Sequence, residues 1–291
     1  MSVSNRRGVL IRLFLAEGVS DGLWVVEKSN WTGIGLVCPR ASYPSARTRD
    51  ELARPGVYVL VGPSEEGADR SRVYVGEADV LSKRLDQHYA TRDFWTRAVV
   101  FTSKDQNLNK AHVRYLEARL VRLALDAQRA EVENGTAPKL PALSESEAAE
   151  MDAFLDEMLA IYPVADVRAF DKIDSSGSAS TRLHVSGPDA KAEGAETPEG
   201  FVVFSGSVAR ATEVPSIHHY LKDLRGSLVA EGVLSPEGPS LRFTRDYLFN
   251  SPSTAAGVVL GRSANGRVEW KDTEQRTLRD IAAASVATSA P

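Results

Sequence analysis

Five residues in the middle of the chain have side chains suited to chemistry on a phosphate ester, in the order Tyr58, Tyr74, Arg84, His88 and Glu117. A carboxylate such as Glu117 is a hard oxygen ligand that suits Mg²⁺ or Mn²⁺, which keeps most of its waters. The planar guanidinium of Arg84 matches the oxygens of a phosphate. Hydrolysis also needs a group that takes a proton from the attacking water. The set therefore predicts a site for metal-assisted hydrolysis of a phosphodiester.

Each of these residues also has an ordinary structural explanation. Tyrosine is a common filler of half-buried strands. Arg84 could pair with a carboxylate on a helix surface, and Glu117 could be a solvated helix residue paired with Arg114 or Lys110. His88 could be a plain surface residue. Their order along the chain is what favours a shared site.

The segment that carries these residues alternates strands and helices. Short apolar runs predict strands, and apolar residues at helical spacing predict helices. His88 follows Arg84 by one helical turn, so both project from the same face. The expected elements are strands over 56–61, 72–76 and 97–102, a helix over 80–89 capped by Asp79, and a helix over 110–129 capped by Asn109.

Gly56-Val57-Tyr58 and Tyr74-Val75-Gly76 resemble the two signature triplets of the GIY-YIG nuclease family. Arg84, ten positions after Tyr74, stands where the family has its arginine. Glu117 stands where it has its metal-binding glutamate, and Asn134 where many members have an asparagine. The resemblance covers residues 54–134. It implies an α+β fold, a small mixed β-sheet flanked by helices, and a DNA endonuclease of restriction, defence or repair that uses Mg²⁺ or Mn²⁺.

The resemblance also implies roles for the aromatic residues. Tyr58 or Tyr74 would be the general base, and His88 would pass a proton or contact the phosphate. Two features depart from the family pattern: fifteen residues (59–73) separate the two tyrosines, and Glu77 stands where several members have a basic residue. An acidic group there would repel a phosphate or help to hold the metal. A non-catalytic nucleic-acid-binding or regulatory protein on the same scaffold is therefore the alternative.

Other basic and polar residues are candidates for binding nucleic acid. Those in the middle of the chain could form a phosphate-facing rim, and those near the C-terminus lie beside a predicted helix end and an Asn-Gly turn. Exposed residues of a scaffold explain the same pattern. The candidates are Lys104, Lys110, Arg114, Asn134, Arg262, Asn265 and Arg267.

Composition divides the chain into five parts. Residues 135–200 hold five Lys and Arg against 13 Asp and Glu, so the acidic excess of the chain lies in this segment. The net charge of -4 therefore does not exclude binding of nucleic acid by the rest of the chain. Residues 173–200 hold too few apolar side chains to offset the entropy of ordering them, although Leu183-His184-Val185 could form a short strand. The expected parts are a β-rich segment that packs on the core or forms a separate module (1–53), the nuclease-like domain (54–165), an acidic flexible linker (166–200), a C-terminal α+β domain (201–285) and a disordered tail (286–291).

Within the C-terminal part, residues 235–285 resemble a small domain of unknown function that recurs beside nucleases. A nucleic-acid or targeting module, or a surface for a homodimer or a partner protein, is expected there. The single cysteine, Cys38, excludes a disulfide framework and a multi-cysteine zinc site. No apolar run is long enough for a membrane span and no signal peptide is expected, which predicts a cytoplasmic protein without a membrane partner.

Overall fold

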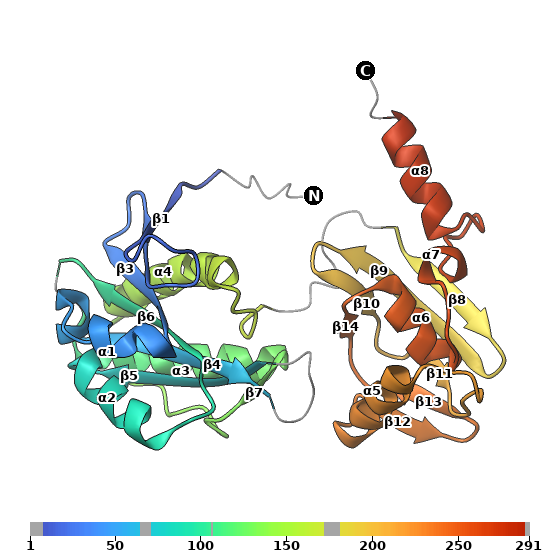
Figure 1. Ribbon diagram of the computed structural model, residues 1–291, viewed down its shortest axis with the longest axis horizontal. Helices are drawn as coiled ribbons and strands as arrows, with labels where there is room; N and C mark the ends of the chain where they lie inside the picture. The colour runs from blue at the N-terminus through green and yellow to red at the C-terminus, as the bar shows by residue number, and fades with distance from the viewer. Residues whose placement is uncertain (1–7, 65–70, 106, 172–180, 289–291) are drawn as a thin grey trace. The chain divides into compact units, whose positions relative to one another are not determined.

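A computed structural model describes residues 8–64, 71–105, 107–171 and 181–288 (Figure 1). The chain divides into two compact units, Met1–Lys172 and Ile173–Pro291, called here the first and the second unit. Each unit has its own β-sheet, helices and hydrophobic core, so the predicted α+β class is confirmed. Within the described ranges, none of the helices combines the length and the apolar character that a membrane span requires.

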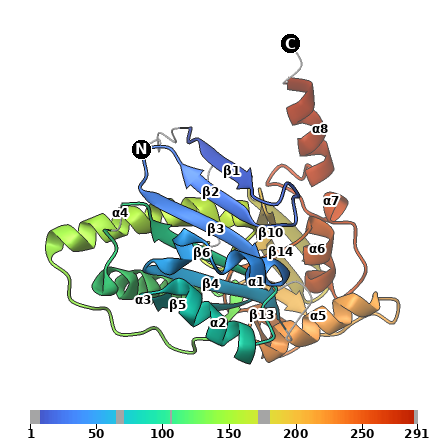
Figure 2. The ribbon, with the colours of Figure 1, turned by 60° about the vertical axis from the view of Figure 1, so that its left-hand side comes forward.

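The first unit is built on a seven-stranded sheet in the order β1-β2-β3-β6-β4-β5-β7 (Figure 2). Neighbouring strands are antiparallel except β5 and β7, which are parallel. The strands are β1 Ile11–Leu15, β2 Trp24–Lys28, β3 Gly33–Pro39, β4 Gly56–Pro63, β5 Ser71–Ala78, β6 Arg97–Ser103 and β7 Ala130–Val132. The helices are α1 Tyr43–Ala46, α2 Leu81–Thr91, α3 Lys110–Ala127 and α4 Glu145–Ile161, with 3₁₀ turns at Arg40–Ser42, Asp50–Ala53 and Tyr162–Ala165.

Helices cover both faces of this sheet. The central strand β4 is buried on both sides, and its side chains alternate between two cores. Val57, Val59 and Val61 belong to one core with apolar residues of α3 and α4. Tyr58 and Leu60 belong to the other, with residues of α1 and α2. The predicted strands and both long helices are therefore present, and they form three layers.

The N-terminal segment is not a separate module. Strand β3 pairs with β6 along its whole length, from Gly33 opposite Ser103 to Pro39 opposite Arg97. Residues 11–39 therefore extend the same sheet, because β3 pairs with the edge of β6 that β4 leaves free. The first unit also continues past residue 165, since Val167, Ala169 and Phe170 are buried in its core.

The second unit contains an antiparallel sheet in the order β12-β13-β11-β9-β10-β14, with β8 paired to β9. Helix α6 packs on this sheet and is buried from Ala255 to Leu260. Trp270 is fully buried against the ring of Phe201, with 4.4 Å between the ring centres. The strands are β8 Leu183–Gly187, β9 Ala190–Thr197, β10 Gly200–Val203, β11 Val208–Arg210, β12 Leu234–Glu237, β13 Ser240–Phe243 and β14 Tyr247–Phe249. The helices are α5 His219–Ala230, α6 Pro252–Leu260, α7 Gly266–Glu269 and α8 Leu278–Thr288.

The prediction of a flexible linker over 166–200 is wrong for its described residues from 181 onward. Strand β9 buries Ala190 and Ala192 in the main core of the second unit, while Ala195 lies on the opposite face in a small cluster with Val202 and Phe204, so small alanines supply apolar contacts that the composition concealed. Residues 172–180 of that segment lie outside the described residues. The prediction of a disordered tail over 286–291 is wrong for 286–288, because helix α8 runs to Thr288, and 289–291 lie outside the described residues.

Candidate active site

The first triplet tyrosine, Tyr58, lies fully buried in the middle of β4, directly opposite Gly76 of β5. A Cβ added to Gly76 would lie 2.3 Å from the hydroxyl oxygen of Tyr58. A Cβ added to Gly56 would lie 2.4 Å from the backbone oxygen of Phe101 on the neighbouring strand. Both triplet glycines therefore act by leaving space: one for the tyrosine ring, the other for close packing of β4 on β6.

The second half of β5 is an open edge of the sheet. On the side of β5 away from β4, strand β7 pairs only with Ser71–Val73, so no described strand covers that side of the rest of β5. At Val75 the side chain of Asn134 takes the place of a strand, since its Oδ1 accepts from Val75 N–H at 2.9 Å and its Nδ2 donates to Val75 C=O at 2.8 Å. Asn134 therefore holds the backbone of β5.

Helix α2 brings two predicted residues to this edge. His88 is buried, and its Nε2 lies 2.8 Å from the Tyr58 hydroxyl. The ring of Tyr74 lies 5.1 Å from the His88 ring, between ring centres. Arg84, one turn earlier, is exposed and donates to Gln87 Oε1 at 2.9 Å. The predicted spacing of Arg84 and His88 on one helix face is thus observed, although Val80, and not Asp79, precedes the helix as its cap.

Burial and charge perturb the titration of this group. Burial lowers the pKa of His88 to about 4, and the cations Arg84 and Arg92 act in the same direction, so the imidazole is neutral at pH 7. Burial also raises the pKa of Tyr58, with a further contribution from Tyr74, while Arg84 opposes the shift. Tyr58 therefore carries its proton at neutral pH.

Helix α3 contributes Glu117, half-buried on the side that faces β5. Burial and the neighbouring carboxylate of Glu77 raise the pKa of Glu117 to about 7. Lys110, at the start of α3, places its ammonium 2.9 Å from Glu77 Oε2 and 3.2 Å from Asp79 Oδ2. Two carboxylates and a lysine thus meet at one end of the site.

These side chains line one pocket of about 510 Å³. Four of the five predicted catalytic residues reach it, and His88 lies behind it against Tyr58. Asp79, Lys83 and Gln87 also line the pocket but were not predicted as site residues. Helical spacing could have indicated two of them, because Lys83 and Gln87 are one helical turn apart and Gln87 lies three residues after Arg84. The lining residues are Tyr58, Tyr74, Glu77, Ala78, Asp79, Val80, Lys83, Arg84, Gln87, Lys110 and Glu117.

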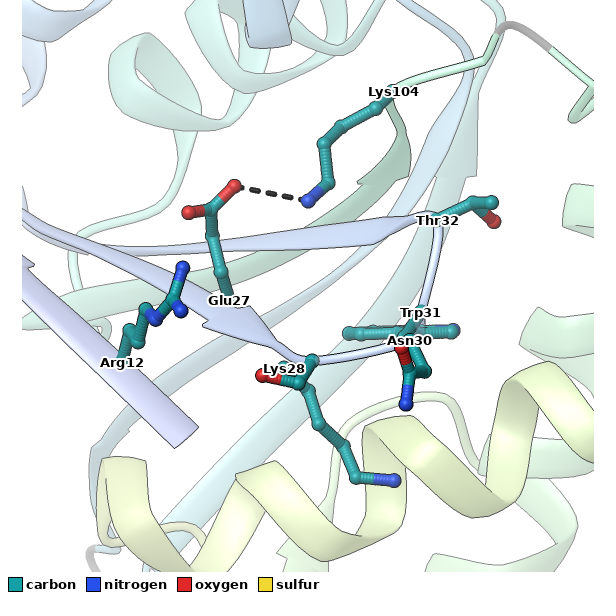
Figure 3. A pocket seen from close by; sticks show the side chains of 8 residues that line it. Arg12, Glu27, Lys28, Asn30, Trp31, Thr32 and Lys104 are labelled. Atoms are coloured by element: carbon teal, nitrogen blue, oxygen red, sulfur yellow. Dashed lines mark hydrogen bonds and ion pairs between the residues drawn. The ribbon is translucent and has the colours of Figure 1, made fainter. Parts of the chain in front are cut away.

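The expected phosphate-facing rim is only partly assembled. Lys110 lies in the pocket, and Arg114 is exposed on α3 near enough to lower the pKa of Glu117. Lys104 lies elsewhere, in a separate pocket with Arg12, Lys28 and Trp31, where it forms an ion pair with Glu27 at 2.9 Å (Figure 3). Asn134 is engaged with β5.

The C-terminal candidates lie in the second unit, where two of the three have structural partners. Arg262 pairs with Glu269 at 2.7 Å. Asn265 caps helix α7, because its Oδ1 accepts from Arg267 N–H at 3.1 Å. The Asn265-Gly266 pair therefore begins a short helix and not the predicted hairpin turn. Arg267 itself is exposed.

Comparison with protein families assigns one part of the chain. Residues 183–282 match the family described as Domain of unknown function (DUF4357). The match supports the C-terminal small domain that the sequence suggested and extends it toward the N-terminus, from residue 235 to 183, so that it includes β8 and β9. No curated protein and no solved structure matches the chain.

The donor set of the pocket fits a hard divalent cation. Within the described residues, no group of three or more His, Cys, Asp and Glu is placed to hold a metal. Mg²⁺ and Mn²⁺ need fewer protein ligands, because they bind through one or two carboxylates and retain water. Burial, and after it the carboxylate of Glu77, raises the pKa of Glu117, so the ionised form of Glu117 would gain from a bound cation.

Proposed function

We propose that the first unit is a divalent-metal-dependent phosphodiesterase that acts on DNA as an endonuclease. One observation carries the proposal: Tyr58, Tyr74, Arg84 and Glu117, drawn from β4, β5, α2 and α3, line the same pocket. These residues are far apart in the sequence, and the resemblance to the GIY-YIG family requires them to converge. DNA is the substrate that this resemblance implies.

In this proposal, Glu117 holds Mg²⁺ or Mn²⁺, with Glu77 as the nearest further carboxylate. When bound, such an ion would neutralise charge on the phosphate and lower the pKa of a bound water. Arg84 is exposed at the mouth of the site, so its guanidinium is available to bind the phosphate oxygens.

The Tyr58 hydroxyl and His88 provide the path for the proton. Tyr58 carries its proton at neutral pH, so it acts as a relay: it takes a proton from the attacking water and gives its own to His88 Nε2. With a pKa of about 4, His88 is a weak acceptor, first because it is buried and further because Arg84 and Arg92 are cationic. A phosphate bound to Arg84 would neutralise part of that charge and raise the pKa of His88.

Cleavage of plasmid and of short single- and double-stranded DNA in Mg²⁺ or Mn²⁺ tests the proposal. We expect products with the wild-type chain and a rate at least about 100-fold lower with Arg84→Ala or Glu117→Ala. Arg279→Ala, at an exposed arginine of the second unit that is not a candidate for binding nucleic acid, is the matched control and should retain cleavage. An absence of products on every substrate, or undiminished cleavage by Glu117→Ala, would contradict the proposal.

A second candidate function is metal-independent binding of nucleic acid. It is favoured by Lys110, whose ammonium already supplies a positive charge between Glu77 and Asp79. A non-catalytic protein of this kind would bind DNA equally well with EDTA and with Mg²⁺. It would also be insensitive to Arg84→Ala, whereas the proposed nuclease would bind more weakly.

A further inference from the structure

Strand β1 forms the outer edge of the first unit's sheet (Figure 2), and its side chains are unusually apolar for such a position. Val9, Leu10, Leu13, Phe14 and Leu15 are between 37% and 64% exposed. Arg12 is the only charged residue from Val9 to Ala16. Edge strands normally carry charges or proline that prevent pairing, as Pro236 and Glu237 do on edge strand β12 of the other sheet.

The backbone of β1 also has an orderly set of groups that face outward. Ala16 N–H donates to Leu23 C=O, and Ser29 N–H donates to Leu10 C=O, so the even-numbered residues bond to β2. Bonding alternates along an antiparallel strand. The N–H and C=O groups of Ile11, Leu13 and Leu15 therefore point away from β2, and no described strand pairs with them.

We propose that β1 pairs antiparallel with β1 of a second copy of this chain, about a two-fold axis at Leu13. Leu13 is the middle residue of the five that form β1, so this register pairs the whole strand. Leu13 faces Leu13 of the other copy, and Ile11 faces Leu15. These three residues are the ones whose N–H and C=O groups point away from β2, so they can form the hydrogen bonds of an antiparallel pair. Arg12 faces Phe14 of the other strand, which avoids like charges in opposition and permits a cation–π contact.

The apolar area is sufficient for a specific dimer. Taking about 180 Å² for a large apolar side chain, the five exposed residues offer on the order of 500 Å² per copy, or roughly 1,000 Å² for the pair. That area lies at the lower limit for a specific interface, so a dissociation constant in the micromolar range is expected. The proposal is independent of the nuclease function, because it uses no residue of the pocket.

Sedimentation equilibrium over about 1–200 µM protein tests the proposal. The wild-type chain should be a dimer, and Leu13→Lys and Leu13→Glu should each weaken it by at least about 100-fold, because like charges would face each other. Mixing the two variants should restore a 1:1 heterodimer to within about tenfold of the wild-type affinity. Val19→Lys, an equal change at an exposed apolar residue beyond the strand, should leave the dimer intact.

A second measurement uses the only cysteine of the native chain, Cys38, which is buried. Leu13→Cys adds an accessible thiol, and mild oxidation should link two copies, while Val19→Cys should not. A wild-type monomer over the whole concentration range would overturn the proposal. A dimer that persists in both charged variants would also overturn it, because another surface would then form the dimer. Charged variants that fail to dimerise when mixed would overturn it as well, because the two Leu13 side chains would then not face each other.

Discussion

The hydroxyl oxygen of Tyr58 and Nε2 of His88 lie 2.8 Å apart inside the protein, with Tyr58 in the wall of the pocket and His88 behind it. Neither residue would be notable alone, since buried tyrosines and histidines usually have a hydrogen-bond partner. Here the partner of each is a group that can move a proton, and Tyr58 also lines the pocket. The pair therefore connects the pocket to a neutral imidazole.

Tyr58→Phe keeps the ring and removes the hydroxyl. If Tyr58 relays the proton, cleavage should fall by about 100-fold or more while the thermal midpoint changes by only a few degrees. Tyr74→Phe is the matched control, because Tyr74 also lines the pocket but has no hydrogen bond to His88. A larger loss in Tyr74→Phe than in Tyr58→Phe would transfer the role to Tyr74.

His88 should make the first unit sensitive to acid. Its pKa is about 4 in the folded chain and near 6.5 when unfolded, so between these values the unfolded state binds more protons. The contribution of this residue to stability is therefore present above pH 6.5 and is lost as pH falls toward 4, by roughly 3 kcal/mol. Denaturant unfolding from pH 4 to 7 should show a smaller pH dependence for His88→Gln, whereas His219→Gln, at an exposed site, should follow the wild type.

Glu117→Gln removes the proposed metal ligand with almost no change in shape. We expect cleavage to fall by at least about 100-fold, and Mn²⁺ to raise the thermal midpoint of the wild type but not of this variant. Glu77→Gln determines the role of the unusual acidic residue. Weaker Mn²⁺ stabilisation would identify Glu77 as a second ligand, and stronger DNA binding without loss of Mn²⁺ would show that it repels phosphate. Equal Mn²⁺ stabilisation in Glu117→Gln and wild type would contradict the proposed ligand.

Gly76→Ala should destabilise the first unit by about 1–3 kcal/mol, because its methyl group would overlap the Tyr58 ring. Gly226→Ala is the matched control, since a Cβ there meets open space within helix α5 and should stabilise that helix by about 0.5–1 kcal/mol. Differential scanning calorimetry would measure both changes. An unchanged midpoint in Gly76→Ala would show that Tyr58 can move aside at little cost.

The parts of the fold that could be predicted are those in which local pattern and tertiary role agree. Strands β4 and β5 and helices α2 and α3 have clear apolar periodicity and were predicted close to their observed bounds. Strand β9 was missed because its buried positions are alanines and a glycine, whose side chains are too small to stand out as an apolar run.

The same distinction holds for the site. Tyr58, Tyr74, Arg84 and Glu117 could be identified from type and order, since the topology fixes which elements meet. Asn134 was predicted because many members of the GIY-YIG family have an asparagine at that point, but its contacts with β5 depend on where β7 ends. Lys104 was misplaced for a similar reason: it follows β6, and the pairing of β3 with β6 carries it to Glu27.

The glycine opposite Tyr58 has one more consequence. With Gly76 leaving the space, the tyrosine ring crosses the neighbouring strand in a single orientation that is established when the sheet forms. The rotational entropy of that side chain is therefore lost during folding, and a ligand entering the pocket meets a hydroxyl that no longer needs to be immobilised.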